Sequence, residues 1–147
     1  MTLENSFSPE EMEVLRGIFL SSSNQCLDAM RGILDAWPEG GPGEERLKQF
    51  HRAAHSVKGA AMQIGYLPIG ELARELERAV LALLAGAPAD ESWRRAAEQA
   101  CAILGDDLEA LRAGREMSPP DQRLLRELKR LGGAGAAQGA DRPAAES

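Results

Sequence analysis

Apolar residues recur every three or four positions along most of the chain, which is the spacing of one face of an α-helix. The first such segment begins at residues 8–11, where a serine can cap the helix, a proline fits its first turn and a glutamate completes a capping box. Apolar positions then continue to Trp37, and the Gly- and Pro-rich residues 38–43 end the segment. Small polar residues at positions 21–25 leave open whether this segment is one kinked helix or two helices.

Three further segments carry the same apolar spacing and predict three more helices. The second helix is expected over residues 44–64, with Gly65 ending it in a left-handed conformation. The third has Pro68 in its first turn and closes before residues 86–88, and the fourth is capped by Asp90 and runs to about residue 113. Four amphipathic helices with short turns predict an all-α fold, an antiparallel up-down-up-down four-helix bundle over residues 1–114.

A short appended C-terminal helix is predicted within residues 115–131, starting near Ser118. Residues 132–147 are rich in Gly, Ala and Pro and predict a disordered tail. The appended helix is locally basic, and it could be a solvated cap or a second contact for a partner. Its basic residues are Arg123, Arg126, Lys129 and Arg130.

Composition and charge exclude several classes of function. The 147 residues suit one domain, and an aromatic content of 4% disfavours a β-sandwich or barrel. A net charge of −6 argues against a protein that binds nucleic acid by neutralising phosphates. The longest uncharged run, residues 79–89, is too short to cross a bilayer, and the first residues lack the pattern of a signal peptide. Cys26 and Cys101 show no metal-ligand spacing, so we expect both to be reduced thiols in a cytoplasmic protein. We also expect a monomer without nucleic-acid or membrane partners.

Candidate chemistry is concentrated at His55, one of only two histidines in the chain. The apolar stripe of its helix passes through residues 54, 57 and 61, and His55 lies roughly 115° from the centre of that stripe, towards solvent. Lys58 follows one turn later, so its ammonium group can reach the space beside the ring. Gly59 costs about 1 kcal/mol in a helix interior relative to Ala, and it leaves room for a bulky group next to the imidazole. A phosphoryl group on an imidazole nitrogen needs this combination of nucleophile, cation and clearance.

Glu77, on the third helix, is the expected partner of the other ring nitrogen of His55. It lies on the flank of the stripe through Leu76 and Val80. Counting turns back from the connection at residues 65–68 places it at about the height of His55. A carboxylate bonded to the ring would fix its tautomer and raise its basicity.

The stretch at residues 55–59 reads His-Ser-Val-Lys-Gly, and a second glycine follows at Gly65. It resembles the H-x-x-K-G signature of histidine-containing phosphotransfer (HPt) domains. Residues 8–113 are similar in particular to the N-terminal phosphotransfer domain of chemotaxis histidine kinases. That group often carries a second histidine where this chain has Arg74.

The resemblance implies a function as well as a fold. His55 would carry phosphate on Nε2, Lys58 would stabilise the phosphoryl group, Gly59 would provide clearance and Glu77 would bond the ring. The partners would be a sensor histidine kinase and the receiver domain of a response regulator, whose aspartate gives or takes the phosphoryl group. The chain would then be a phosphorelay intermediate, a phosphocarrier without independent turnover. We expect no cofactor on this chain, and Mg²⁺ would belong to the site of the receiver.

A docking surface for the partner is expected around His55. Ile18, Phe19 and Ser22 on the first helix, with Met62 on the site helix, could frame the histidine with an apolar rim. Ile18 and Phe19 could equally be core residues.

His51 lies one turn before His55 and could line the site or simply be exposed. The two histidines have the i, i+4 spacing of a metal clip, with Glu77 as a conceivable third ligand. Lys58 would repel a cation and no fourth ligand is evident, so no metal site is predicted. The chain shows no Gly-rich nucleotide loop, which argues against autophosphorylation. The alternative function is a helical protein-interaction module in which His55 is incidental.

Overall fold

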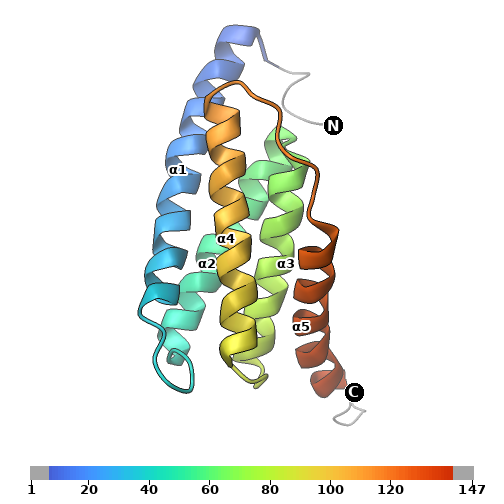
Figure 1. Ribbon diagram of the computed structural model, residues 1–147. Helices are drawn as coiled ribbons and strands as arrows, with labels where there is room; N and C mark the ends of the chain where they lie inside the picture. Colours follow the sequence, from blue (N-terminus) through green and yellow to red (C-terminus); the bar gives the residue numbers. More distant parts are fainter. Residues whose placement is uncertain (1–6, 141–147) are drawn as a thin grey trace.

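The structure is a computed structural model that describes residues 7–140, and all its regular secondary structure in that range is helical, without a strand. The predicted all-α fold class is therefore confirmed. Figure 1 shows the helices lying lengthwise beside one another, with the chain turning back at each connection. They are α1 (Pro9–Asp35), α2 (Glu44–Ile64), α3 (Leu67–Leu84), α4 (Glu91–Arg112) and α5 (Gln122–Ala140).

The start of α1 confirms the predicted capping box. The Glu11 backbone N–H donates to Ser8 Oγ at 3.1 Å, and the Ser8 N–H donates to Glu11 Oε1 at 2.8 Å. The helix continues without a break through residues 21–25, so the first segment is one helix. Ser23 lies in this stretch and is buried on the core face of α1.

The end of α2 and the start of α4 also follow the sequence signals. Gly65 has a φ of 107° in the left-handed region, and its N–H donates to the Ala61 carbonyl. Asp90 Oδ1 accepts from the Trp93 N–H at 3.0 Å and caps α4. These ends set the lengths and the register of the helices that hold the site.

The core is filled by the inner faces of the helices, and Trp93 is one of its largest fully buried side chains. Trp93 is 1% exposed, and its indole N–H donates to the Ala79 carbonyl at 3.0 Å. Its ring stacks on Trp37 and meets the edge of Phe50. Since Phe50 belongs to α2, this packing anchors the helix that carries His55 one turn later.

The helix α5 packs against the outer side of α3 (Figure 1). Asp121 Oδ1 caps it by accepting from the Leu124 N–H at 3.0 Å. Leu124, Leu125 and Leu128 are its buried stripe. In the described residues, this packing joins α5 to the first four helices as one structure.

The helix α5 is longer than expected, since it runs to Ala140 instead of ending near residue 131. Residues 132–140 are therefore helical where a disordered tail was expected, and residues 141–147 lie outside the described part of the chain. Alanine has the highest helix propensity, and Gly132 allows a close approach: a Cβ there would lie 3.2 Å from Cβ of Arg78. This glycine therefore packs α5 against α3 and does not end the helix.

None of the helices described, over residues 7–140, combines the length and the apolar composition needed to cross a membrane.

Candidate functional site

His55 lies on the surface where α2 meets α3. The core face of α2 holds Ala54, Val57 and Ala61, each at most 2% exposed, and this orientation turns His55 outward to the flank. The His55 side chain is 59% exposed. Its ring can therefore be reached by another protein while one edge stays against α3.

Glu77 of α3 holds that inner edge, as predicted from the turn count. His55 Nδ1 lies 2.7 Å from Glu77 Oε2. An ionised carboxylate only accepts hydrogen bonds, so Nδ1 carries a proton and donates a hydrogen bond to Glu77. The lone pair of the neutral ring is then on Nε2, the nitrogen on the far side of the ring from Glu77.

Lys58 binds the second oxygen of the same carboxylate, with Nζ 2.8 Å from Glu77 Oε1. Burial alone would raise the pKa of Glu77, but the hydrogen bonds and charges of Lys58 and His55 together outweigh it and hold this pKa below its usual value. Glu77 is thus a carboxylate anion at neutral pH. Lys58 is held beside the imidazole through Glu77, not by a contact with the ring.

His51 belongs to this cluster, which settles the two possibilities left open by the sequence. Its Nε2 lies 3.2 Å from Glu77 Oε2, and its ring centroid is 6.0 Å from that of His55. The side chain is 28% exposed, half as much as that of His55. His51 therefore lines the site, with its Nε2 close to the Glu77 carboxylate. Its i−4 spacing from His55 is the signal that could have placed it there.

Gly59 faces open space on the surface of α2. A Cβ built at this position meets no atom within 4 Å. Packing within the described part of the molecule therefore does not require the glycine, although it weakens the helix. One remaining reason for a glycine at position 59 is that it leaves room for a group that approaches His55 from outside.

The expected docking residues Ile18, Ser22 and Met62 are exposed or partly exposed. Ile18 is 61% exposed and Ser22 is also exposed, and both line a shallow hollow on α1. Met62 is half-buried, with its sulfur over Gly70 of α3, where a Cβ would lie only 2.9 Å away.

Phe19 belongs to the core, which corrects its assignment to a docking rim. It is 2% exposed, and its ring meets that of Tyr66 edge-on with centroids 5.1 Å apart. Ile18 and Phe19 are neighbours on a helix, so their side chains point about 100° apart and only one of them can face the core.

The cluster presents the imidazole of His55 as its more exposed nucleophile. Nε2 of His55 is outward, Nδ1 is held by an anion, and an ammonium group lies on the other side of that anion. Within the described residues, no set of three or more His, Cys, Asp or Glu side chains is arranged to hold a metal ion. The arrangement suits attack by Nε2 on an electrophile brought by another molecule, with Glu77 balancing the positive charge that then develops on the ring.

The family model described as "Hpt domain" matches residues 14–114 of the chain. The match includes all of α2, α3 and α4 and most of α1, and so contains the whole cluster around Glu77. The helix α5 lies beyond it. A search of curated proteins found no similar sequence.

Proposed function

The chain belongs to the Hpt domain family, whose members have a histidine phosphotransfer role in two-component signalling, and from this premise we propose that it is a phosphorelay intermediate. His55 carries the phosphoryl group on Nε2 and exchanges it with an aspartate of a response-regulator receiver domain. A sensor histidine kinase is the other candidate partner. The protein acts as a monomeric cytoplasmic phosphocarrier whose first four helices form an antiparallel bundle.

The observation that carries the proposal is the bond from His55 Nδ1 to Glu77, made while the other edge of the ring is open. In the forward step the Nε2 lone pair attacks phosphorus, an N–P bond forms, and the bond from phosphorus to the aspartyl oxygen breaks. The Nδ1 proton stays in place and the charge on the ring is balanced by Glu77. In the reverse step an aspartate oxygen attacks phosphorus and the N–P bond breaks, so no water or proton is consumed.

Lys58 and Gly59 support the transfer in different ways. Lys58 is held by Glu77 and supplies positive charge near a phosphoryl group that brings almost two negative charges. Gly59 keeps the helix surface low one turn after His55, so that the receiver can bring its carboxylate in line with Nε2. Mg²⁺ belongs to the receiver, and this chain needs no cofactor of its own.

The partner reaches His55 across the exposed side of α2. Ile18 and Ser22 on α1 offer accessible contacts on one side of α2, and Met62 and His51 lie on the other side, next to α3. A receiver placed over His55 can touch both sides. This docking surface accounts for the exposure of a large apolar residue such as Ile18.

Labelling with a phosphodonor tests the proposal. The chain is incubated with phosphoramidate and, separately, with phosphorylated receiver domains, and the label on the protein is measured. We expect an acid-labile, alkali-stable label that is absent in His55→Gln and present in His51→Gln. A wild-type chain that stays unlabelled with every donor, or a His55→Gln chain that labels normally, contradicts the proposal.

A further inference from the structure

Beyond Glu77, the outer surface of α3 and the adjoining side of α5 carry a group of basic side chains. Arg74 and Arg78 on α3 and Arg126 and Lys129 on α5 are all exposed, and we call them the basic strip. The Hpt match ends at residue 114, so half of this strip lies outside it. The strip has no part in the contacts around Glu77 described above.

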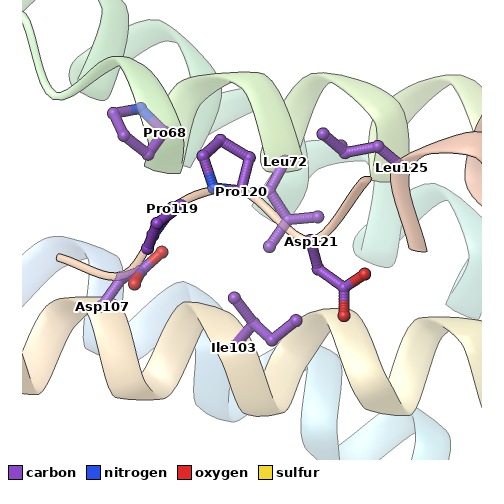
Figure 2. Close-up of a pocket in the computed structure, with 8 residues that line it drawn as sticks. All are labelled: Pro68, Leu72, Ile103, Asp107, Pro119, Pro120, Asp121 and Leu125. Carbon is purple, nitrogen blue, oxygen red and sulfur yellow. The ribbon is translucent and has the colours of Figure 1, made fainter. Parts of the chain in front are cut away.

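The contacts between α3 and α5 place the two halves of the strip at the same height. Leu72 and Leu125 line one cavity, shown in Figure 2, and Gly132 packs against Arg78. The two helices therefore run in the same direction with an offset of 53 to 54 residues, obtained as 125 − 72 and 132 − 78. Residues 126 and 129 then correspond to positions 72 to 76 of α3, within about one turn of Glu77.

The strip and His55 open on the same side of the molecule. On α3, Glu77 points to α2, and Arg74 and Arg78 follow on the solvent side before the contact with α5. On α5, Glu127 lies close to Ser92 of α4, so the flank of α5 that carries Glu127 faces α4 and not the basic strip. Lys129, two residues on, lies on the opposite flank of α5, beside Arg78.

The charges of the strip are mostly free of partners. Arg74 Nε lies 3.7 Å from the buried Glu75 carboxylate. In the part of the chain with described side chains, no carboxylate lies within 4.0 Å of the charged groups of Arg78, Arg126 or Lys129. By contrast, Arg130 on the flank towards α4 is paired with Glu127 at 2.7 Å. A protein of net charge −6 therefore gathers mostly unpaired cations on the side of the molecule that carries its nucleophile.

We propose that the basic strip docks an acidic surface of the partner protein, the surface that flanks the aspartate exchanging its phosphoryl group with His55. This inference rests on the proposed function and names the chemistry of the partner. A carboxylate that reacts with the help of Mg²⁺ lies among other oxygen ligands that hold the ion, so its surroundings are acidic. Packed helices are about 10 Å apart, which puts the strip one to two helix widths from His55, inside an interface of standard size.

Electrostatic docking of this kind acts mainly on the rate of association. Complementary charges steer two proteins together and raise the association rate by about tenfold or more at low salt. The interaction of exposed charges falls as the screening length shortens to about 10 Å at 0.1 M salt. Transfer between proteins should therefore depend on both the strip and the ionic strength. Labelling by a small donor should depend much less on either of them.

The test compares a charge-reversal pair with a matched control. The variant Arg78→Glu with Lys129→Glu changes the strip, and Arg46→Glu with Arg95→Glu makes the same change of net charge at exposed positions of α2 and α4. A panel of purified receiver domains is screened for the one that exchanges phosphoryl groups fastest with the wild-type chain. Transfer rates with that receiver are then measured from about 0.05 M to about 0.5 M NaCl.

We expect the strip variant to lose about tenfold in transfer rate at low salt and to lose most of the salt dependence of the wild type. The control pair should keep both the transfer rate and its salt dependence. The charge-conserving pair Arg78→Lys with Lys129→Arg should transfer at about the wild-type rate. Labelling of His55 by phosphoramidate should be unchanged in every variant, which shows that the site and the fold are intact. Equal transfer by strip and control variants, with normal phosphoramidate labelling, overturns this inference alone. Failure of the wild type to label at all overturns the proposed function with it.

Discussion

At the scale of single residues, Glu77 is the side chain that positions the other groups of the site. Its two oxygens accept from His55 and Lys58 at 2.7 and 2.8 Å, and His51 Nε2 lies 3.2 Å from Oε2. One carboxylate therefore sets the tautomer of the nucleophile and fixes the position of the nearby ammonium group. A histidine that is free to rotate and to exchange its proton between both nitrogens lacks this preorganisation.

Glu77→Ala should lower the rate of His55 labelling by about 10- to 100-fold, the usual cost of removing the acceptor that orients a functional histidine. Glu77→Gln should be intermediate, because the amide oxygen still accepts from Nδ1 but no longer balances the charge of the ring. The rates are measured with phosphoramidate, and circular dichroism checks the fold. His51→Gln serves as the control and should stay within a few fold of the wild type. Labelling at the wild-type rate in Glu77→Ala would remove Glu77 from the mechanism.

The sequence predicts the pair of His55 and Glu77, because helical periodicity places both on flanks and a short connection fixes their heights. The choice between Ile18 and Phe19 does not follow in the same way. The apolar stripe of α1 is interrupted by polar residues nearby, so two adjacent apolar residues compete for the core and tertiary packing decides. The contact with Tyr66, which follows the end of α2, gives the core position to Phe19.

At the scale of elements, α5 is the part of the molecule least evident from the sequence. Its basic composition and its Gly-rich end are typical of a solvated segment, but its leucine stripe covers α3. On α3, the side chain of Glu75 is completely buried. Neither oxygen of the Glu75 carboxylate has a hydrogen-bond partner, and Arg74 Nε at 3.7 Å is its nearest recorded ion-pair contact among the described residues. The apolar periodicity of α3 does not predict the burial of this acidic side chain.

Glu75→Leu should therefore stabilise the protein. Replacing a buried carboxyl group that has no hydrogen-bond partner by an apolar side chain of similar size removes the cost of burying it, and we expect the free energy of unfolding to rise by about 2 kcal/mol. Urea unfolding curves measure the change. Glu75→Gln is the control and should give a smaller effect, since its amide is buried without partners as well. A loss of stability in Glu75→Leu would show that the carboxylate makes a favourable interaction that its contacts do not reveal.

At the scale of the whole molecule, the connection between α4 and α5 lies beside a further buried acidic side chain, Asp107 of α4. Asp107 is 5% exposed and lines a cavity with Leu72 of α3 and with Pro119 and Pro120 of the connection (Figure 2). Burial, with a smaller contribution from the charge of Asp106, raises the pKa of Asp107 to about 6. The docking of the connection and α5 therefore favours the protonated form of this side chain.

Stability should fall as the pH rises through this range. The unfolded chain loses the Asp107 proton near pH 3.8 and the folded chain near pH 6, so between these values the folded state binds more protons. Its contribution to the free energy of unfolding then decreases by at most about 3 kcal/mol from pH 4 to pH 6 and is constant above that. Thermal unfolding of the wild type and of Asp107→Asn between pH 4 and pH 7 measures the difference. The stability of Asp107→Asn should depend less on pH over this range. The same pH dependence in both proteins would contradict the raised pKa of Asp107.

The most direct test of the central claim is to locate the phosphoryl group on the protein itself. The chain is labelled with ¹⁵N at histidine, phosphorylated with phosphoramidate and studied by ³¹P and ¹⁵N NMR. We expect one phosphohistidine, with the N–P bond at Nε2 of His55, a proton retained on Nδ1 and no phosphorus coupling at His51. A bond at Nδ1 of His55, or a phosphoryl group on His51, would contradict the role that the Glu77 hydrogen bond gives to His55.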